Sequence, residues 1–525
     1  MQTSVTRLET SAAFVRLPRL LTAVLILLPA LWGVGYLVPP LNHDVGALLA
    51  FSRRMLGGER LYADLIDVNP PMAFWLNLPA LWLAKLTGGS EAVMFQATVL
   101  AAIAVGALLT LKAASPLVEQ TGPIVRVLVP SLALFAVAVL PAHSFGQRDH
   151  LVLVFTLPYI ALTAGRLNGA RYSTGLALAI GGFAAIGLSL KPYFLVLPVL
   201  LELLVLARRG WDQTWHPTPI AILVALIGYL GLVLIAMPEY LGFVVPLVQD
   251  HYQSLSMAAL PALLIGDQVP ALVIGLFVCT LLARRAVPFS LLAPLLAAIL
   301  AFTVSGLLQA KGWDYHFIAA RGALGILAGL ALGALIERVL DPRRTSVGAT
   351  GAITAMVVAV VWLMSGALNP PFAAQSRFAT STAGRMSDVI RTHAAGGHVL
   401  WLSSSIYPQY PALNHGGATS AMRWMSLWLL PALYGKNAVV NGRLVPNPPE
   451  AMGLAENLLF RSIGDDVSRR QPALIIVQDA AREGGFNGKA FDYLDYFRRN
   501  PRFAAEWRLY QPLVEIDGIR VFRRQ

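Results

Sequence analysis

The sequence of 525 residues has little cysteine and little charge. Its one cysteine, Cys279, lies inside an apolar run, which excludes a disulfide framework and a thiolate metal site. Charged residues make up 13% of the chain, about half their share in soluble domains, whereas hydrophobic residues make up 56%. Most of the chain is therefore expected to be solvated by lipid.

The formal net charge of +12 comes from 40 Lys and Arg against 28 Asp and Glu. The arginines form short clusters between apolar segments, such as Arg208-Arg209, and do not follow one face of a helix. This pattern argues against nucleic acid as a partner and is typical of cytoplasmic loops of a membrane protein.

Apolar segments of about 20 residues, the length needed to cross a bilayer, recur along the chain. The first, at 18–38, follows Arg7, Arg16 and Arg19, so the N-terminus is expected on the cytoplasmic side. Leu17–Val38 is too long for a cleavable signal and is expected to be retained. Met72–Leu86 is short and is interpreted as a re-entrant or interfacial helix. Ten further spans, which bring the total to eleven, are predicted at 91–111, 124–141, 150–165, 173–190, 193–207, 217–237, 269–283, 288–307, 317–336 and 348–367.

From about Asn369 the composition becomes polar. We expect a membrane domain over 1–368, followed by a small soluble α/β domain over 369–525 on the outer side. Its predicted strands are His398–Leu402, Ala473–Val477 and Val514–Phe522, and Ala451–Ser462 is predicted as a helix. Ser403–Tyr410 follows a strand where α/β sheets hold ligands, so both an acceptor site and an ordinary surface loop remain open.

Ionisable residues gather at the outer ends of the predicted spans, whereas the inner loops hold mainly arginine. This asymmetry predicts one site open to the outside, with carboxylates for acid–base chemistry and cations for an anionic group. The residues concerned are Asp44, Asp64, Asp67, Arg148-Asp149-His150, Lys191, Asp250-His251-Tyr252, Lys311 and Trp313–His316.

Asp44 is the central candidate, because it follows the first apolar segment where hydrocarbon gives way to water. A carboxylate there is partly desolvated, which makes it a better base or metal ligand. The alternative is a loop aspartate that caps the short helix beginning near Gly46.

One segment contains Asp44, then Arg53–Asp64 and then Asp67-Val68-Asn69-Pro70-Pro71. It resembles the first periplasmic loop of the GT-C glycosyltransferases. This superfamily uses polyprenyl-phosphate sugars and includes the protein O-mannosyltransferases and the lipid A aminoarabinose transferases. Arg148–Leu151 is similar to the acid-bearing start of a later span in that family, Lys191-Pro192 to its lysine-containing turn, and Lys311–His316 to its basic, aromatic segment before a late span. The ordered set covers about 370 residues, the membrane part of the chain.

The resemblance implies a multi-pass enzyme of the inner membrane, with an all-α membrane domain and the soluble domain outside. It implies transfer of a hexosyl or pentosyl group from a polyprenyl-phosphate donor to an extracytoplasmic glycan, lipid or protein. Many relatives have an acidic pair in the first loop, whereas His43 and Val45 flank Asp44 here. This departure favours a mechanism without metal. A divalent cation, Mg²⁺ or Mn²⁺, stays open as a cofactor, with His43, His150, His251 and His316 as candidate ligands.

On this resemblance Asp44 is the general base, and Asp149 orients Arg148 or holds a sugar hydroxyl. Lys191, Lys311 and Arg148 bind the donor phosphate, and the substrate-binding candidates are Asp64, Asp67, Tyr193, Trp313, Tyr315 and His316. Snorkelling at span ends is the alternative for the lysines, and an interfacial aromatic belt for the aromatic residues. A transporter or flippase of a lipid-linked sugar and a membrane scaffold are the competing functions. The sequence shows no convincing internal repeat of the kind found in transporters.

Overall fold

A computed structural model describes residues 26–38, 40–118, 121, 123–252, 255, 258–284, 287–339, 371–440 and 442–525. Its chain contacts divide it into two compact units. Unit 1 comprises Met1–Leu37, Gln96–Tyr229 and Ala258–Phe372, and unit 2 comprises Val38–Phe95, Leu230–Met257 and Ala373–Gln525. The domain boundary predicted at 368/369 lies outside the described residues and stays a prediction.

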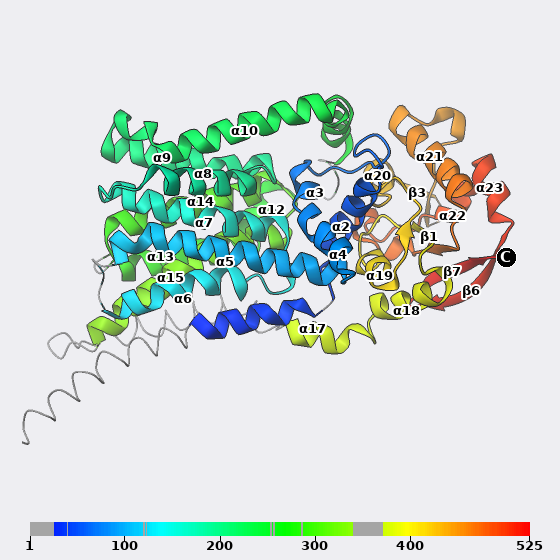
Figure 1. Cartoon of the computed structure of the whole chain (residues 1–525). Coiled ribbons are helices and arrows are strands. Elements are labelled where there is room, and N and C mark those ends of the chain that lie inside the picture. The colour runs from blue at the N-terminus through cyan, green and yellow to red at the C-terminus, as the bar shows by residue number, and fades with distance from the viewer. Residues whose placement is uncertain are drawn as a thin grey trace, which may run out of the picture. The chain divides into compact units, whose positions relative to one another are not determined.

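The described part of unit 1 is a bundle of apolar helices (Figure 1). Its elements, two of which extend into unit 2, are α5 (Glu91–Val118), α6 (Pro123–Ala138), α7 (Arg148–Leu167), α8 (Thr174–Leu188), α9 (Val196–Arg209), α10 (Pro217–Ala236), α12 (Leu260–Ile265), α13 (Gln268–Ala283), α14 (Phe289–Leu308) and α15 (Ile318–Val339).

Five helices among the described residues are long and apolar enough to cross a membrane. They are Glu91–Val118, Arg148–Leu167, Pro217–Ala236, Phe289–Leu308 and Asp314–Ile336. Shorter helices occupy the predicted spans near 124–141, 173–190, 193–207 and 269–283. The span at 348–367 and residues 18–25 of the first span lie outside the described residues, so the number eleven remains a prediction.

Helix α7 is the centre of unit 1, where it contacts α8, α9, α14 and α15. It is apolar on every side and almost entirely buried. The hydroxyls of Thr156 and Thr163 donate to the carbonyls of Val152 and Tyr159 one turn earlier, which removes their need for outside partners. The charged residues of α7, Arg148, Asp149 and Arg166, lie in its first and last turns.

Unit 2 joins the polar tail to residues that precede it by hundreds of positions. Its helices are α2 (His43–Leu56), α3 (Met72–Trp75), α4 (Leu78–Thr87), α11 (Val245–Leu247), α18 (Thr382–Ala394), α19 (Gln409–Gly416), α20 (Leu429–Tyr434), α21 (Leu454–Arg470), α22 (Tyr493–Arg498) and α23 (Pro501–Trp507), and α17 (Pro371–Phe378) begins at its boundary with unit 1. The predicted re-entrant segment Met72–Leu86 is thus two short helices, α3 and α4.

The tail contains a five-stranded sheet in the order β2-β1-β5-β7-β6. Strand β1 (His398–Leu402) is parallel to β2 (Thr419–Ser420) and to β5 (Leu474–Val477). Strand β7 (Ile519–Arg524) is antiparallel to β5 and to β6 (Tyr510–Ile516). A separate hairpin pairs β3 (Val439–Val440) with β4 (Arg443–Leu444).

The prediction of one strand over Val514–Phe522 is wrong. The chain reverses at Asp517 and Gly518, both with positive φ, so the segment is the end of β6, a turn and the start of β7. An Asp-Gly pair is a strong hairpin signal, because both central positions of such a turn need positive φ.

Candidate active site

A buried ion pair lies at one end of the unit 1 bundle. Asp149, in the first turn of α7, is fully buried, and its Oδ2 is 2.6 Å from Nζ of Lys191, just after α8. A carboxylate is favoured in the first turn of a helix by the helix dipole. Because α8 runs back along α7, the end of one meets the start of the other.

Gln309, which follows α14, completes this cluster. Its Oε1 accepts a hydrogen bond from Lys191 Nζ at 2.6 Å, and its Nε2 donates to Asp149 Oδ1 at 3.5 Å. The amide thus contacts both charged partners. A buried ion pair is stable only when its remaining donors and acceptors also form hydrogen bonds, and Gln309 provides such bonds here. Gln309 was not among the site residues expected from the sequence, where its only signal is a single amide directly after an apolar helix.

Aromatic rings surround the Lys191 ammonium. Nζ lies 5.4 Å from the ring centroid of Tyr315 and 5.8 Å from that of Phe194, within range of cation–π attraction. The ring centroid of Trp313 lies 5.8 Å from that of Tyr315 and 5.4 Å from that of His316. The predicted segment Trp313–His316 therefore lies at the same end of the bundle as the ion pair.

Arg148 and Lys311 belong to the same electrostatic environment. The imidazole of His316, itself buried, interacts electrostatically with Lys191, Asp149, Arg148 and Lys311. Burial lowers the pKa of Lys311 to about 8. Asp314 pairs with Arg321 at 2.8 Å, so these two charges offset each other.

Tyr193 is the predicted substrate-binding residue with the weakest connection to this cluster. Its backbone carbonyl accepts a hydrogen bond from the Ser305 hydroxyl at 2.8 Å, which ties the turn after Lys191 to α14. Its backbone thus has a clear structural role, whereas a substrate contact by its phenol remains a prediction.

Asp44 belongs to unit 2, in the first turn of α2. The helix cap is Asn42, whose side chain accepts a hydrogen bond from the Asp44 backbone N–H at 2.9 Å. The alternative role of Asp44 as the cap is therefore wrong. Its Oδ1 lies 3.7 Å from His43 Nε2, and its side chain is 12% exposed against 41% for His43.

The other two acids of this loop differ from Asp44 and from each other. Asp67 is buried and accepts hydrogen bonds from the backbone and side-chain nitrogens of Asn69, which shapes the turn before Pro70. Asp64 is exposed and pairs with Arg60. A hydrogen bond from the Arg60 backbone and the Arg60 guanidinium lower the pKa of Asp64.

The histidines form no recognisable metal site in the part of the chain that the structure describes, where no three His, Cys, Asp or Glu side chains are grouped to hold an ion. His150 already uses both ring nitrogens. Nδ1 accepts from the Gly146 N–H at 2.9 Å, and Nε2 lies 2.7 Å from the Val137 carbonyl. His150 is therefore a structural residue in this arrangement.

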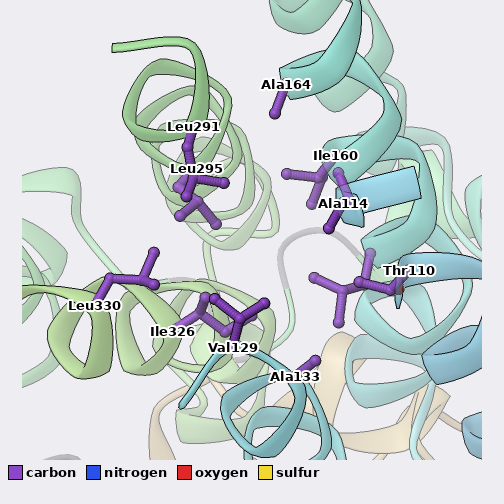
Figure 2. Close-up of a pocket in the computed structure, with 12 residues that line it drawn as sticks. Thr110, Ala114, Val129, Ala133, Ile160, Ala164, Leu291, Leu295, Ile326 and Leu330 are labelled. Atoms are coloured by element: carbon purple, nitrogen blue, oxygen red, sulfur yellow. The ribbon is translucent and has the colours of Figure 1, made fainter. Parts of the chain in front are cut away.

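An apolar cavity of about 50 Å³ lies elsewhere in unit 1 (Figure 2). Leu157, Ile160 and Ala164 of α7 line it, and the first of these lies roughly 12 Å along the helix from Asp149. Its one polar side chain, Thr110, donates to the carbonyl of Gly106. The cavity therefore offers no group for acid–base or phosphate chemistry.

No protein-family model matches the sequence, and no curated protein matches it. Solved structures that share its fold include two of one protein. One is ArnT from Cupriavidus metallidurans bound to undecaprenyl phosphate, with 15% identity and a TM-score of 0.56 over 97% of this chain and 98% of that chain. The other is the same protein in the apo state, with 16% identity and a TM-score of 0.55 over 98% of each chain. ArnT is a lipid A aminoarabinose transferase, so this chain has the fold of a GT-C membrane glycosyltransferase, as the sequence resemblance predicted.

Proposed function

We propose that the protein is a membrane glycosyltransferase that moves a sugar from a polyprenyl-phosphate donor to an extracytoplasmic acceptor. The observation that carries this proposal is the buried Asp149–Lys191–Gln309 cluster, with its neighbouring cations, in a chain that shares the fold of a protein that binds undecaprenyl phosphate. A purely structural ion pair would not need a surplus of positive charge beside it.

The charge of the cluster suits a phosphate leaving group. Lys191, Lys311 and Arg148 supply three cations and Asp149 one carboxylate, which leaves a surplus of two positive charges when both lysines are protonated. The donor is a phosphodiester with one negative charge, whereas the released polyprenyl phosphate carries up to two. Fixed cations in a water-poor site therefore stabilise the charge that develops as the bond breaks.

The reaction is a direct displacement at the anomeric carbon of the sugar. The acceptor oxygen forms a bond to that carbon while the bond from carbon to the phosphate oxygen breaks, and the electron pair leaves with the phosphate. Asp44 takes the proton from the acceptor hydroxyl as general base. Asp149 holds Lys191 in place through the 2.6 Å contact, which is a positioning role.

Substrate-binding roles follow for the remaining candidates. Trp313, Tyr315 and His316 lie beside Lys191, where they would line the pocket of the lipid phosphate or the sugar ring. Asp67 shapes the first loop, and Asp64 is an exposed acid that a substrate hydroxyl reaches from solvent. Eleven spans, a cytoplasmic N-terminus and an extracytoplasmic tail complete the proposal.

The test uses purified protein in lipid nanodiscs with a radiolabelled polyprenyl-phosphate sugar and an envelope extract as acceptor. We expect release of free polyprenyl phosphate together with label in the acceptor. Asp44→Asn should lower transfer by about 100- to 10,000-fold, the range for loss of a general base, with donor binding unchanged. Asp388→Asn, an exposed acid of unit 2 paired with Arg391, is the matched control.

Near-normal sugar transfer by the Asp44→Asn variant would assign the role of general base to Asp67 or Asp149 instead. Movement of the labelled lipid across the bilayer of proteoliposomes without cleavage would instead support a transporter or flippase. The two functions are distinguished by whether the bond from sugar to phosphate breaks.

A further inference from the structure

Helix α19, to which a connection leads from the end of β1, lies against the start of α2 within unit 2. The Asn414 side chain of α19 donates to the Gly46 carbonyl at 3.0 Å, and the Leu41 N–H donates to the His415 ring at 3.4 Å. A Cβ at Gly46 would lie 2.8 Å from Asn414 Oδ1, so a larger residue at this crossing would have to displace the Asn414 amide. The segment that carries Asp44 and the segment that follows β1 therefore have a fixed relation.

The end of β1 is also the point in the sheet where ligands are expected. In the sheet, β2 lies on one side of β1 and β5 lies on the other. The strand order therefore changes direction between β1 and β5, and the carboxyl ends of these two strands lie on either side of that point. Open α/β sheets bind ligands in the crevice outside such a point.

The base of the connection is firmly held by one carboxylate, Glu483. It accepts hydrogen bonds from the Ser403 hydroxyl at 2.8 Å, from the Ser404 N–H at 2.9 Å, from the Ser404 hydroxyl and from the Tyr493 hydroxyl at 2.6 Å. Burial raises the pKa of Glu483, although these hydrogen bonds act in the opposite direction. The loop is thus braced at its start.

The tip presents Tyr407, which is 45% exposed. Its ring is edge-on to the His43 imidazole at 6.2 Å between centroids, and His43 is 3.7 Å from Asp44. An exposed aromatic face, an imidazole and a carboxylate thus lie next to one another. Two residues further on, Gln409 is fully buried, and neither atom of its amide has a hydrogen-bond partner among the described residues.

These groups match the chemistry of a sugar ring. The apolar C–H face of a saccharide packs on an aromatic ring, and its hydroxyls donate to carboxylate or imidazole. Resting on the proposed function, we propose that Tyr407 and His43 form the acceptor platform beside Asp44, and that the acceptor is a saccharide whose ring stacks on Tyr407. The carboxylate that removes the proton then lies next to the ring that positions the hydroxyl.

The experiment is saturation-transfer NMR on the full-length protein in nanodiscs with millimolar D-glucose, D-mannose, N-acetylglucosamine and L-arabinose. A peptide containing serine and threonine is measured in parallel. The variants are Tyr407→Ala, Tyr407→Phe and, as an exposed aromatic control in the same unit, Trp82→Ala. Both Tyr407 and Trp82 are exposed, so these substitutions leave the folded core intact.

We expect saturation transfer to the ring protons of at least one sugar, a loss of at least fivefold in Tyr407→Ala, and retention in Tyr407→Phe and Trp82→Ala. Signals that survive Tyr407→Ala, the absence of signal from every sugar, or a Tyr407-dependent signal from the peptide alone would each overturn the inference. Donor cleavage is measured separately on the wild-type protein. A sugar contact at Tyr407 without donor cleavage would refute the proposed transferase and keep the saccharide site, whereas cleavage without that contact would do the reverse.

Discussion

Replacement of Lys191 by methionine tests the buried ion pair and its proposed role together. Asp149 is fully buried, and Lys191 is the ammonium 2.6 Å from its carboxylate. Lys191→Met keeps a side chain of similar length but removes the charge. The Asp149 carboxylate is then left in the bundle with Gln309 as its close polar contact.

The expected cost is large, because removal of one partner from a buried pair leaves an uncompensated charge. Such changes cost about 3–5 kcal/mol, roughly 150- to 5,000-fold in the unfolding equilibrium. Adding Asp149→Asn removes the stranded charge, and replacement of a whole buried pair is often neutral or stabilising. We therefore expect the double variant to recover most of the lost stability.

The assay is unfolding of detergent-purified protein, followed by tryptophan fluorescence, together with binding of undecaprenyl phosphate. Lys112→Met, at an exposed lysine on α5, is the control for loss of a lysine alone. The double variant should be stable yet bind undecaprenyl phosphate at least tenfold more weakly than the wild type. Stability of Lys191→Met equal to that of Lys112→Met would refute the burial argument, and normal lipid binding by the stable double variant would refute the phosphate-binding role.

Two further predictions concern pH and sidedness. Burial lowers the pKa of Lys311 to about 8, so its positive charge is present below that pH and lost above it. The affinity for undecaprenyl phosphate should therefore fall between pH 7 and 9 in the wild type and stay constant in Lys311→Arg. An identical fall in both proteins would exclude Lys311 as the cause. For topology, Cys279→Ala removes the single cysteine of the sequence, and Lys436→Cys or Asn168→Cys is then added to this background. A membrane-impermeant maleimide applied to spheroplasts should label the cysteine at 436 but not the one at 168. The reverse pattern would invert the proposed orientation.

The positions of many elements could be predicted from the sequence, because they depend on local hydropathy and residue preferences. The predicted strand His398–Leu402 matches β1, and the predicted spans at 91–111, 150–165 and 288–307 fall on α5, α7 and α14. The prediction failed at Val514–Phe522, where a continuous β-type composition concealed the Asp-Gly turn. Composition over a window indicates strand residues but not where the chain reverses.

The candidate site was only partly accessible to such reasoning. The predicted topology put Asp149, Lys191 and Tyr315 at the outer ends of their spans. In the structure these three residues lie close together. Gln309 was missed because its importance rests on contacts with residues 118 and 160 positions away. Neither contact leaves a periodic or compositional trace in the chain.

The sequence by itself determined the class of the molecule, since long apolar segments and scarce charge can be solvated only by lipid. It also determined which residues lie at the ends of those segments. Only the tertiary structure decided which carboxylate meets which cation, and that the first loop belongs to the same compact unit as the tail. Arg54 shows the reason: its partners include Glu59, five residues away, and the carbonyl of Met422, 368 residues away. Such long-range pairs form only when packing has brought distant segments within hydrogen-bonding distance, which local patterns do not encode.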